Sequence, residues 1–101
     1  MFLETPYEMA LNTAKIFREL RKRKNITIKT VSEKSGVPYS TVRRFERLGE
    51  ISFVSLVKLV SAIGEDAEIT GLFAMSYLCY IYHHEYIVSN TKRTAYEYSY
   101  L

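Results

Sequence analysis

Residues 27–49, TIKTVSEKSGVPYSTVRRFERLG, decide the fold that we predict for this chain of 101 residues. Thr27 belongs to the residue types that cap helix N-termini, and Gly36 can end a helix in a left-handed conformation. We therefore expect one helix between these two residues, followed by a turn. A second helix over about residues 39–48 closes at Gly49.

Two short helices joined by a turn that contains Gly have the outline of a helix-turn-helix. In that arrangement the first helix braces the second, which presents side chains to the major groove of DNA. Val31 and Val42 stand where the two helices would touch. A generic helical hairpin fits the same pattern, so the outline alone leaves both interpretations open.

A long helix is predicted before this pair. Thr5 is a plausible N-cap, Pro follows it at the first helical position, and Glu8 completes a capping box. The helix ends in the basic run at 21–24, before Asn25, which tolerates a left-handed turn. Its spacing predicts one buried stripe, formed by Met9, Thr13 or Ile16, Phe17 and Leu20.

Two further helices are predicted after Gly49. One runs over 53–63, with Ser52 as its cap and Gly64 at its end, and the next runs over about 66–73. The positions expected to be buried are Leu56, Val57, Leu59, Val60 and Ile63 in the first and Ile69, Leu72 and Phe73 in the second. The sequence thus predicts an all-α domain of five helices over residues 1–73.

Positive charge is concentrated in the central part of the chain. Residues 21–47 hold nine Lys and Arg against two Asp and Glu, whereas the whole chain has a net charge of only +3. A basic segment of this kind indicates a polyanionic partner. The alternative is a solvated basic face without a partner.

Residues 16–64 resemble the Xre/Cro-type helix-turn-helix family of phage and bacterial repressors. Three pieces carry the resemblance, in order and at the right spacing: L-R-x-x-x-x-I-T from Leu20, S-G-V-P-x-S-T-V-x-R-F-E from Ser35, and I-S-x-x-S-L-x-K-L from Ile51. The resemblance implies a lambda-repressor-like fold and sequence-specific binding to double-stranded DNA.

The resemblance also implies roles for single residues. It places the candidate base contacts on the exposed face of the recognition helix, at Tyr39, Ser40, Arg43 and Arg44. Arg44 shares a face with Ser40, four residues earlier, and arginine is suited to bidentate contact with guanine. For Arg43, a phosphate contact or plain solvation is the alternative.

The candidate phosphate contacts are Lys22, Arg23, Lys24, Thr27, Lys29, Thr41 and Arg47. Arg21 and Glu46 match a pair that, in the family, forms a partly buried ion pair between the first helix and the recognition helix. Two separate surface charges are the alternative. The family often has Gln, a phosphate ligand, at position 28, where this chain has Ile, and usually Ala at position 32, where it has Ser.

A Tyr-rich extension is predicted over residues 74–101, where seven of the nine tyrosines follow residue 76. Its β-branched and aromatic residues favour a strand, whose open edge would pair with a second chain and hold a dimer. A helix with a stripe of Leu78, Tyr82 and Tyr86 is the alternative. Weak order is expected from Ser89 onward.

Several classes of function are disfavoured. Cys79 is the only cysteine, which excludes a disulfide framework, favours a reducing cytosol and suggests a buried apolar role for this side chain. Adjacent His83 and His84 point to opposite faces of a strand, so a metal site is not expected. No nucleophile–base arrangement or phosphate-binding Gly loop is present, so we expect no enzyme activity and no cofactor.

The predicted function is a DNA-binding repressor that dimerises on a palindromic operator and regulates its own gene. No apolar run has the length of a membrane span, so we expect a cytoplasmic protein associated with the nucleoid. Residues 41–59 are similar to the HipB-like antitoxins, which implies a HipA-like kinase toxin as a partner. The alternative function is a protein–protein adaptor that keeps the fold without reading DNA.

Overall fold

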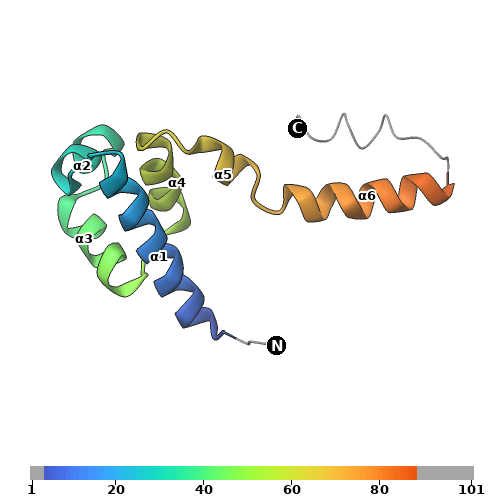
Figure 1. Cartoon of the computed structure of the whole chain (residues 1–101), viewed down its shortest axis with the longest axis horizontal. Helices are drawn as coiled ribbons and strands as arrows, with labels where there is room; N and C mark the ends of the chain where they lie inside the picture. Colours follow the sequence, from blue (N-terminus) through green and yellow to red (C-terminus); the bar gives the residue numbers. More distant parts are fainter. Residues whose placement is uncertain (1–3, 89–101) are drawn as a thin grey trace. The chain divides into compact units, whose positions relative to one another are not determined.

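The computed structural model describes residues 4–88 and divides the chain into two compact units, Met1–Asp66 and Ala67–Leu101. This division lies before the composition boundary near residue 73. The described residues form helices only, in the order α1 (Pro6–Arg23), α2 (Ile28–Ser35), α3 (Tyr39–Leu48), α4 (Phe53–Ala62), α5 (Asp66–Thr70) and α6 (Ala74–Val88) (Figure 1). The all-α prediction is therefore confirmed for these residues.

Local sequence signals set both ends of α1. The backbone N–H of Glu8 donates to the Thr5 hydroxyl at 3.1 Å, and the Thr5 N–H donates to the Glu8 carboxylate at 2.8 Å. This is the predicted capping box. At the other end, Asn25 adopts a left-handed φ of 59°, as its position after the basic run indicated.

The helix-turn-helix also begins and ends where the sequence predicted. The Thr27 hydroxyl accepts from the Thr30 N–H at 3.1 Å and caps α2. Gly36 and Gly49 take left-handed φ values of 77° and 75° at the ends of α2 and α3. Gly49 is required for two reasons. Its φ is left-handed, and a Cβ there would lie 2.8 Å from the backbone carbonyl carbon of Ala10 in α1.

The structure gives a role to Ser32, which stands where the family usually has Ala. Its hydroxyl donates to the Val37 carbonyl at 2.6 Å, and the Val37 N–H donates to the Ser35 hydroxyl at 3.1 Å. Two serines of α2 therefore hold the backbone of the turn that orients α3. The substitution supports the fold rather than weakening it.

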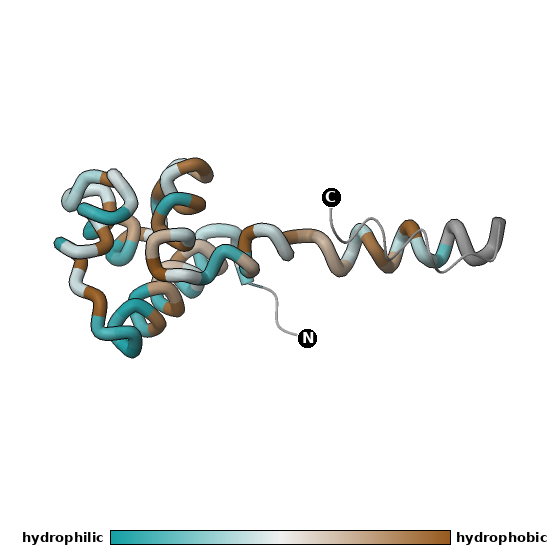
Figure 2. The backbone as a smooth tube through the Cα atoms, turned by 90° about the horizontal axis from the view of Figure 1, so that it is seen from above, coloured by the Kyte–Doolittle hydropathy of each residue, from teal (hydrophilic) through white to brown (hydrophobic). Residues whose placement is uncertain are grey.

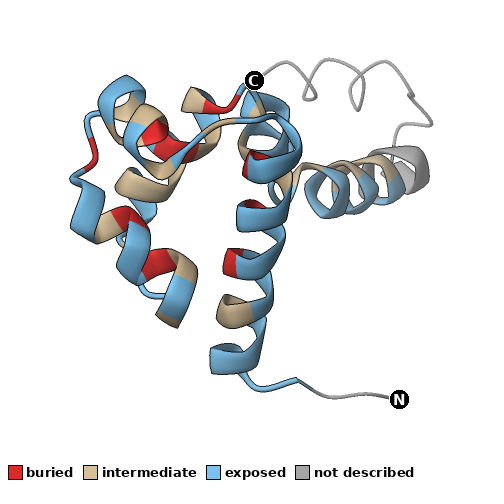
Figure 3. Cartoon of the chain, turned by 60° about the vertical axis from the view of Figure 1, so that its left-hand side comes forward, coloured by how far each residue is buried: buried red, intermediate tan, exposed pale blue. Residues whose placement is uncertain are grey.

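The core of the first unit lies between α1, α2, α3 and α4. Figure 3 shows the buried positions of α1 and α3 on the faces that these helices turn toward each other. Phe17 and Phe45 meet there edge to face, with ring centroids 5.6 Å apart. The buried apolar residues are Ala14, Phe17, Val31, Val37, Val42, Phe45, Leu59 and Ile63.

The predicted stripe of α1 was wrong in part. Phe17 is buried and Leu20 is half-buried, but Met9, Thr13 and Ile16 are exposed, Ile16 by 67%. The face that meets α3 instead follows Ala14, Phe17 and Arg21, at spacings of three and four. Two of the three buried positions on that face are a charged Arg and a small Ala, so the pattern of large apolar residues indicated a neighbouring stripe.

The predictions for the later helices also needed correction. Leu59 and Ile63 are buried, while Leu56, Val57 and Val60 are only partly so. Helix α5 ends at Thr70, and Phe73 then takes a left-handed φ of 65°. Because the helix stops there, Leu72 and Phe73 do not continue a buried face, and both are exposed.

The strand favoured for the start of the extension is wrong, because residues 74–88 form α6. A helix pairs its own N–H and C=O groups, whereas a strand here would need a partner strand. Apolar positions recur along α6 (Figure 2), and Cys79 is exposed rather than buried. The prediction for Ser89 onward, and the side chain of Tyr86, lie outside the described residues.

Candidate nucleic-acid interface

The recognition helix α3 has two distinct faces. Val42 and Phe45 are buried against the core, whereas the predicted base contacts Tyr39, Ser40, Arg43 and Arg44 are all exposed. Val42 and Phe45 are three apart, so one side of the helix is fixed and the opposite side is presented to solvent. The structure therefore brings these four residues to one accessible helix.

Arg21 and Glu46 form a buried, bidentate ion pair between α1 and α3. The Arg21 Nε and Nη2 donate to the two Glu46 oxygens at 2.7 and 2.9 Å, and both side chains are almost fully buried. The Arg21 Nη1 donates to the Ile26 carbonyl at 2.7 Å. The ion pair that the resemblance implied is present, and it fixes α3 against α1.

Arg44 is engaged by a different carboxylate, on the outer side of α3. Its Nε and Nη2 donate to a single Glu50 oxygen at 3.2 and 2.6 Å. Both side chains are more than half exposed. The Nη1 group is not used in this pair, so Arg44 keeps donors for another acceptor while the Glu50 carboxylate offsets its charge.

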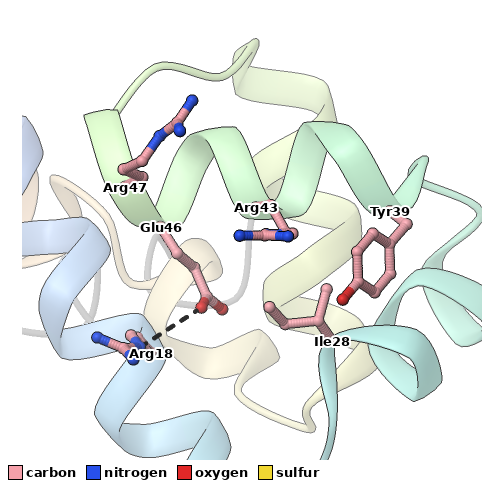
Figure 4. Close-up of a pocket in the computed structure, with 6 residues that line it drawn as sticks. All are labelled: Arg18, Ile28, Tyr39, Arg43, Glu46 and Arg47. Atoms are coloured by element: carbon pink, nitrogen blue, oxygen red, sulfur yellow. Dashed lines mark ion pairs between the residues drawn. The ribbon is translucent and has the colours of Figure 1, made fainter.

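A shallow pocket of about 380 Å³ opens where α1, the start of α2 and α3 meet. In Figure 4 the Arg43 guanidinium lies between Glu46 and Tyr39, and the Tyr39 hydroxyl is directed toward Ile28. Arg18 reaches Glu46 from α1 at 4.0 Å, whereas Arg47 is directed away. We call this the arginine pocket, lined by Arg18, Ile28, Tyr39, Arg43, Glu46 and Arg47.

Arg18 was missed by the sequence reasoning. A signal was available, because Arg18 precedes Arg21 by three residues on the same helix. Once Arg21 is placed against α3, Arg18 must lie on nearly the same side of α1. The resemblance pieces start at Leu20 and therefore do not include it.

The remaining candidate phosphate contacts are distributed over several places. Lys22 and Arg23 are exposed in the last turn of α1, and Lys24 pairs with Glu65 at 2.8 Å. The Thr27 hydroxyl is occupied by the α2 cap, while Lys29 is exposed on α2. Thr41 is half-buried on α3. Only Arg47 of this set lines the arginine pocket.

Two other kinds of feature were looked for in the described part of the chain, a metal site and a membrane-spanning helix. Within residues 4–88, no three His, Cys, Asp or Glu side chains come close enough to hold a metal ion. No helix in that part is both long and apolar enough to cross a membrane.

A family model described as helix-turn-helix, HTH_3, matches residues 17–69, which is more than half of the chain. The chain belongs to this family. HTH_3 comprises Cro/C1/Xre-type DNA-binding domains of transcriptional regulators, and not enzymes. Comparison with curated proteins and with solved structures gave no match. In this HTH_3 domain, α2 and α3 are the helix-turn-helix, and DNA is the partner that the family implies.

Proposed function

We propose that this HTH_3 protein is a sequence-specific transcriptional repressor that inserts α3 into the major groove of double-stranded DNA. The observation that carries the proposal is that α3 has two faces. The inner face, with Val42 and Phe45, is buried against the core, and the outer face, with Ser40 and Arg44, is exposed. The Arg21 Nε lies 2.7 Å from the Glu46 Oε2 and ties α3 to α1, so the position of the outer side chains is set before DNA arrives.

Ser40 and Arg44 are the proposed base readers. They lie one turn apart on the exposed face, and neither lines the arginine pocket. Glu50 engages the Nε and one Nη2 donor of Arg44, and the remaining Nη1 and Nη2 hydrogens can serve an acceptor pair such as guanine O6 and N7. Tyr39 and Arg43 belong to the same face but lie at its edge, in the pocket.

A homodimer on a palindromic operator is part of the proposal. One recognition helix covers few base pairs, and two-fold symmetric dimers reach two half-sites about one helical turn apart. The second unit offers exposed apolar side chains that an isolated chain would leave in water, among them Phe73 at 77% and Met75 at 72%. These residues support an association between two copies.

The proposed regulatory setting is an operon that contains this protein's own gene. The similarity of residues 41–59 to HipB-like antitoxins supports a HipA-like kinase toxin as a neighbour and partner. Such a repressor would act on the nucleoid in the cytoplasm. Copurification of a kinase-like protein encoded beside this gene is the expected result, and a homodimer that recovers no such neighbour would argue against the antitoxin role.

The repressor proposal is tested by binding to the DNA upstream of the protein's own gene. We expect tight, salt-sensitive binding to one upstream site and repression of a reporter placed behind it. A pool of random duplexes, selected by the protein, should converge on the same site. Affinity for the upstream fragment no higher than for random duplex would contradict the proposal.

One observation favours a second candidate function, a protein–protein adaptor. Ile28 lines the arginine pocket at the position where the family often has a phosphate-binding Gln. An apolar residue there removes a DNA contact and offers a surface for a protein. Binding to no duplex above the random level, with α3 variants that still lose a protein partner, would favour the adaptor.

A further inference from the structure

Glu50 follows the recognition helix directly, and the fold fixes its backbone there. Gly49 takes a left-handed φ of 75° and lies so close to α1 that a Cβ would come within 2.8 Å of the Ala10 backbone. Ile51, on the other side of Glu50, packs against the core. The chain is thus held at both neighbours of Glu50, and the Glu50 carboxylate reaches back to Arg44, six residues earlier in α3.

The Arg44–Glu50 pair leaves one edge of the guanidinium group open. A guanidinium group carries five N–H donors in a fixed plane, and two of its edges present a parallel pair of donors. One Glu50 oxygen accepts from Nε at 3.2 Å and from Nη2 at 2.6 Å, so it occupies the edge that contains Nε. The edge formed by Nη1 and the second Nη2 hydrogen is not used by Glu50. Arg44 can therefore bind an acceptor pair without leaving Glu50.

The charge of Glu50 distinguishes two kinds of acceptor that DNA offers to this edge. Guanine O6 and N7 are neutral and form an acceptor pair. A backbone phosphate is anionic, so at the same edge it would be repelled by the Glu50 carboxylate. Binding of Arg44 to a phosphate is therefore penalised, by this repulsion or by loss of the Glu50 pair, whereas binding to guanine is not.

We propose that Glu50 is a positioning residue that sets the specificity of Arg44. Glu50 holds Arg44 by its Nε edge in the complex with the selected site, and it weakens the contact of Arg44 with phosphates on other DNA. The proposal rests on the proposed function, because it takes Arg44 as a base reader. Glu50 acts only through Arg44, as a repulsive element that discriminates against the wrong acceptor.

The test measures the binding of wild type, Glu50→Gln, Arg44→Ala and the double variant to the site selected from random duplexes and to random duplex itself. An exposed ion pair changes an equilibrium by at most about fivefold, so Glu50→Gln should raise the affinity for random duplex by about two- to fivefold. Affinity for the selected site should not rise beyond the control. The preference for that site should therefore fall by about two- to fivefold. Thermal unfolding checks that each variant is folded.

Glu33→Gln, at an exposed carboxylate on α2, is the charge-matched control. It should change the affinity for both duplexes by the same factor, so the preference should stay that of wild type. In the Arg44→Ala background, Glu50→Gln should have no larger effect than this control. A preference that Glu50→Gln leaves unaltered, or a loss that is equally large with and without Arg44, would overturn the proposal.

A second measurement records the side-chain Nε–H signal of Arg44 by NMR. We expect this signal to stay close to its position in the free protein when wild type binds the selected site, and to move when wild type binds random duplex. The reason is that only the second complex disturbs the Glu50 pair. A signal that moves equally in the two complexes would overturn the proposal.

The failure of this proposal can be told apart from the failure of the repressor proposal. A wild type that prefers no duplex sequence would contradict the repressor proposal, and the role of Glu50 in specificity would fall with it. A wild type that prefers one site, with a preference that Glu50→Gln leaves unaltered, would overturn the role of Glu50 alone.

Discussion

The inner and outer faces of α3 each contribute to an Arg–Glu pair, and the two pairs differ in burial. On the inner face, Glu46 accepts two hydrogen bonds from Arg21, and both side chains are below 10% exposure. On the outer face, Arg44 donates to Glu50, and both side chains are more than half exposed. The same two residue types thus form a permanent pair on the inner face, whereas on the outer face each partner can exchange the other for water or a ligand.

This difference shows how burial assigns a role to a charge. A buried ion pair that loses one partner leaves the other charge in a medium that cannot solvate it. Breaking such a pair therefore strongly destabilises the folded protein. An exposed pair is solvated in either state and contributes little to stability. Arg44 can therefore exchange Glu50 for a base at small cost, whereas Arg21 cannot leave Glu46.

The largest effect is expected from Glu46→Ala. Removal of the carboxylate leaves Arg21 buried and unpaired, which should lower the free energy of unfolding by about 3–5 kcal/mol. Urea titration followed by circular dichroism measures it. Glu33→Gln, at an exposed carboxylate on α2, is the control and should change stability by less than about 0.5 kcal/mol. A loss for Glu46→Ala as small as that of the control would show that the two faces do not differ.

A smaller effect, and on binding rather than stability, is expected from Arg44→Ala. Loss of a bidentate base contact should reduce the preference for the selected site over random duplex by about 1–3 kcal/mol. The free energy of unfolding should change by no more than about 1 kcal/mol, because the Glu50 pair is exposed. Fluorescence anisotropy on both duplexes measures the preference. A destabilisation comparable to that of Glu46→Ala would contradict the assignment of Arg44 to the outer face.

Glu50→Gln should strengthen binding to random DNA. The substitution removes a carboxylate that occupies two Arg44 donors and repels phosphates. The pair itself is worth only about 0–1 kcal/mol, so affinity for random duplex at low salt should rise by no more than about fivefold. Glu33→Gln again serves as the charge-matched control. Weaker binding by the Glu50 variant would mean that this carboxylate supports DNA contact.

The smallest effect concerns pH and the N-terminal cap of α1. The Thr5 backbone N–H, and then its hydroxyl, lower the pKa of the Glu8 carboxyl below its ordinary value of 4.5. The capping box therefore stabilises α1 above about pH 4.5, and this contribution is lost as the pH falls through the lowered pKa. An NMR titration of Glu8 should show the lowered pKa. The stability gap between wild type and Glu8→Gln should then close in acid, and a gap that persists there would contradict this account.

The helix ends were the most predictable part of the structure. Thr5, Thr27, Gly36 and Gly49 act through their own backbone conformation or a hydrogen bond within one turn, so local sequence is sufficient to identify them. The Arg21–Glu46 pair required the family resemblance, because 25 residues separate its partners. Periodicity alone could not find it, since it counts Arg21 as a surface residue.

The parts that could not be predicted depend on tertiary placement. Ile16 and Phe17 are adjacent and both large and apolar, yet only Phe17 has an aromatic partner, Phe45, on α3. The arginine pocket is assembled from α1, α2 and α3, so no single stretch of sequence contains it. In α6, β-branched and aromatic residues favoured a strand, but the chain forms a helix that needs no second strand.

The central claim is that α3 reads bases through Arg44, and a base-substitution panel tests it most directly. Affinities of wild type and Arg44→Ala are measured for the selected site and for versions in which each guanine is replaced in turn. We predict that wild type loses about 1–3 kcal/mol at one guanine in each half-site, while the variant loses nothing at that position and keeps its discrimination elsewhere. Identical position profiles for the two proteins would contradict base reading by Arg44.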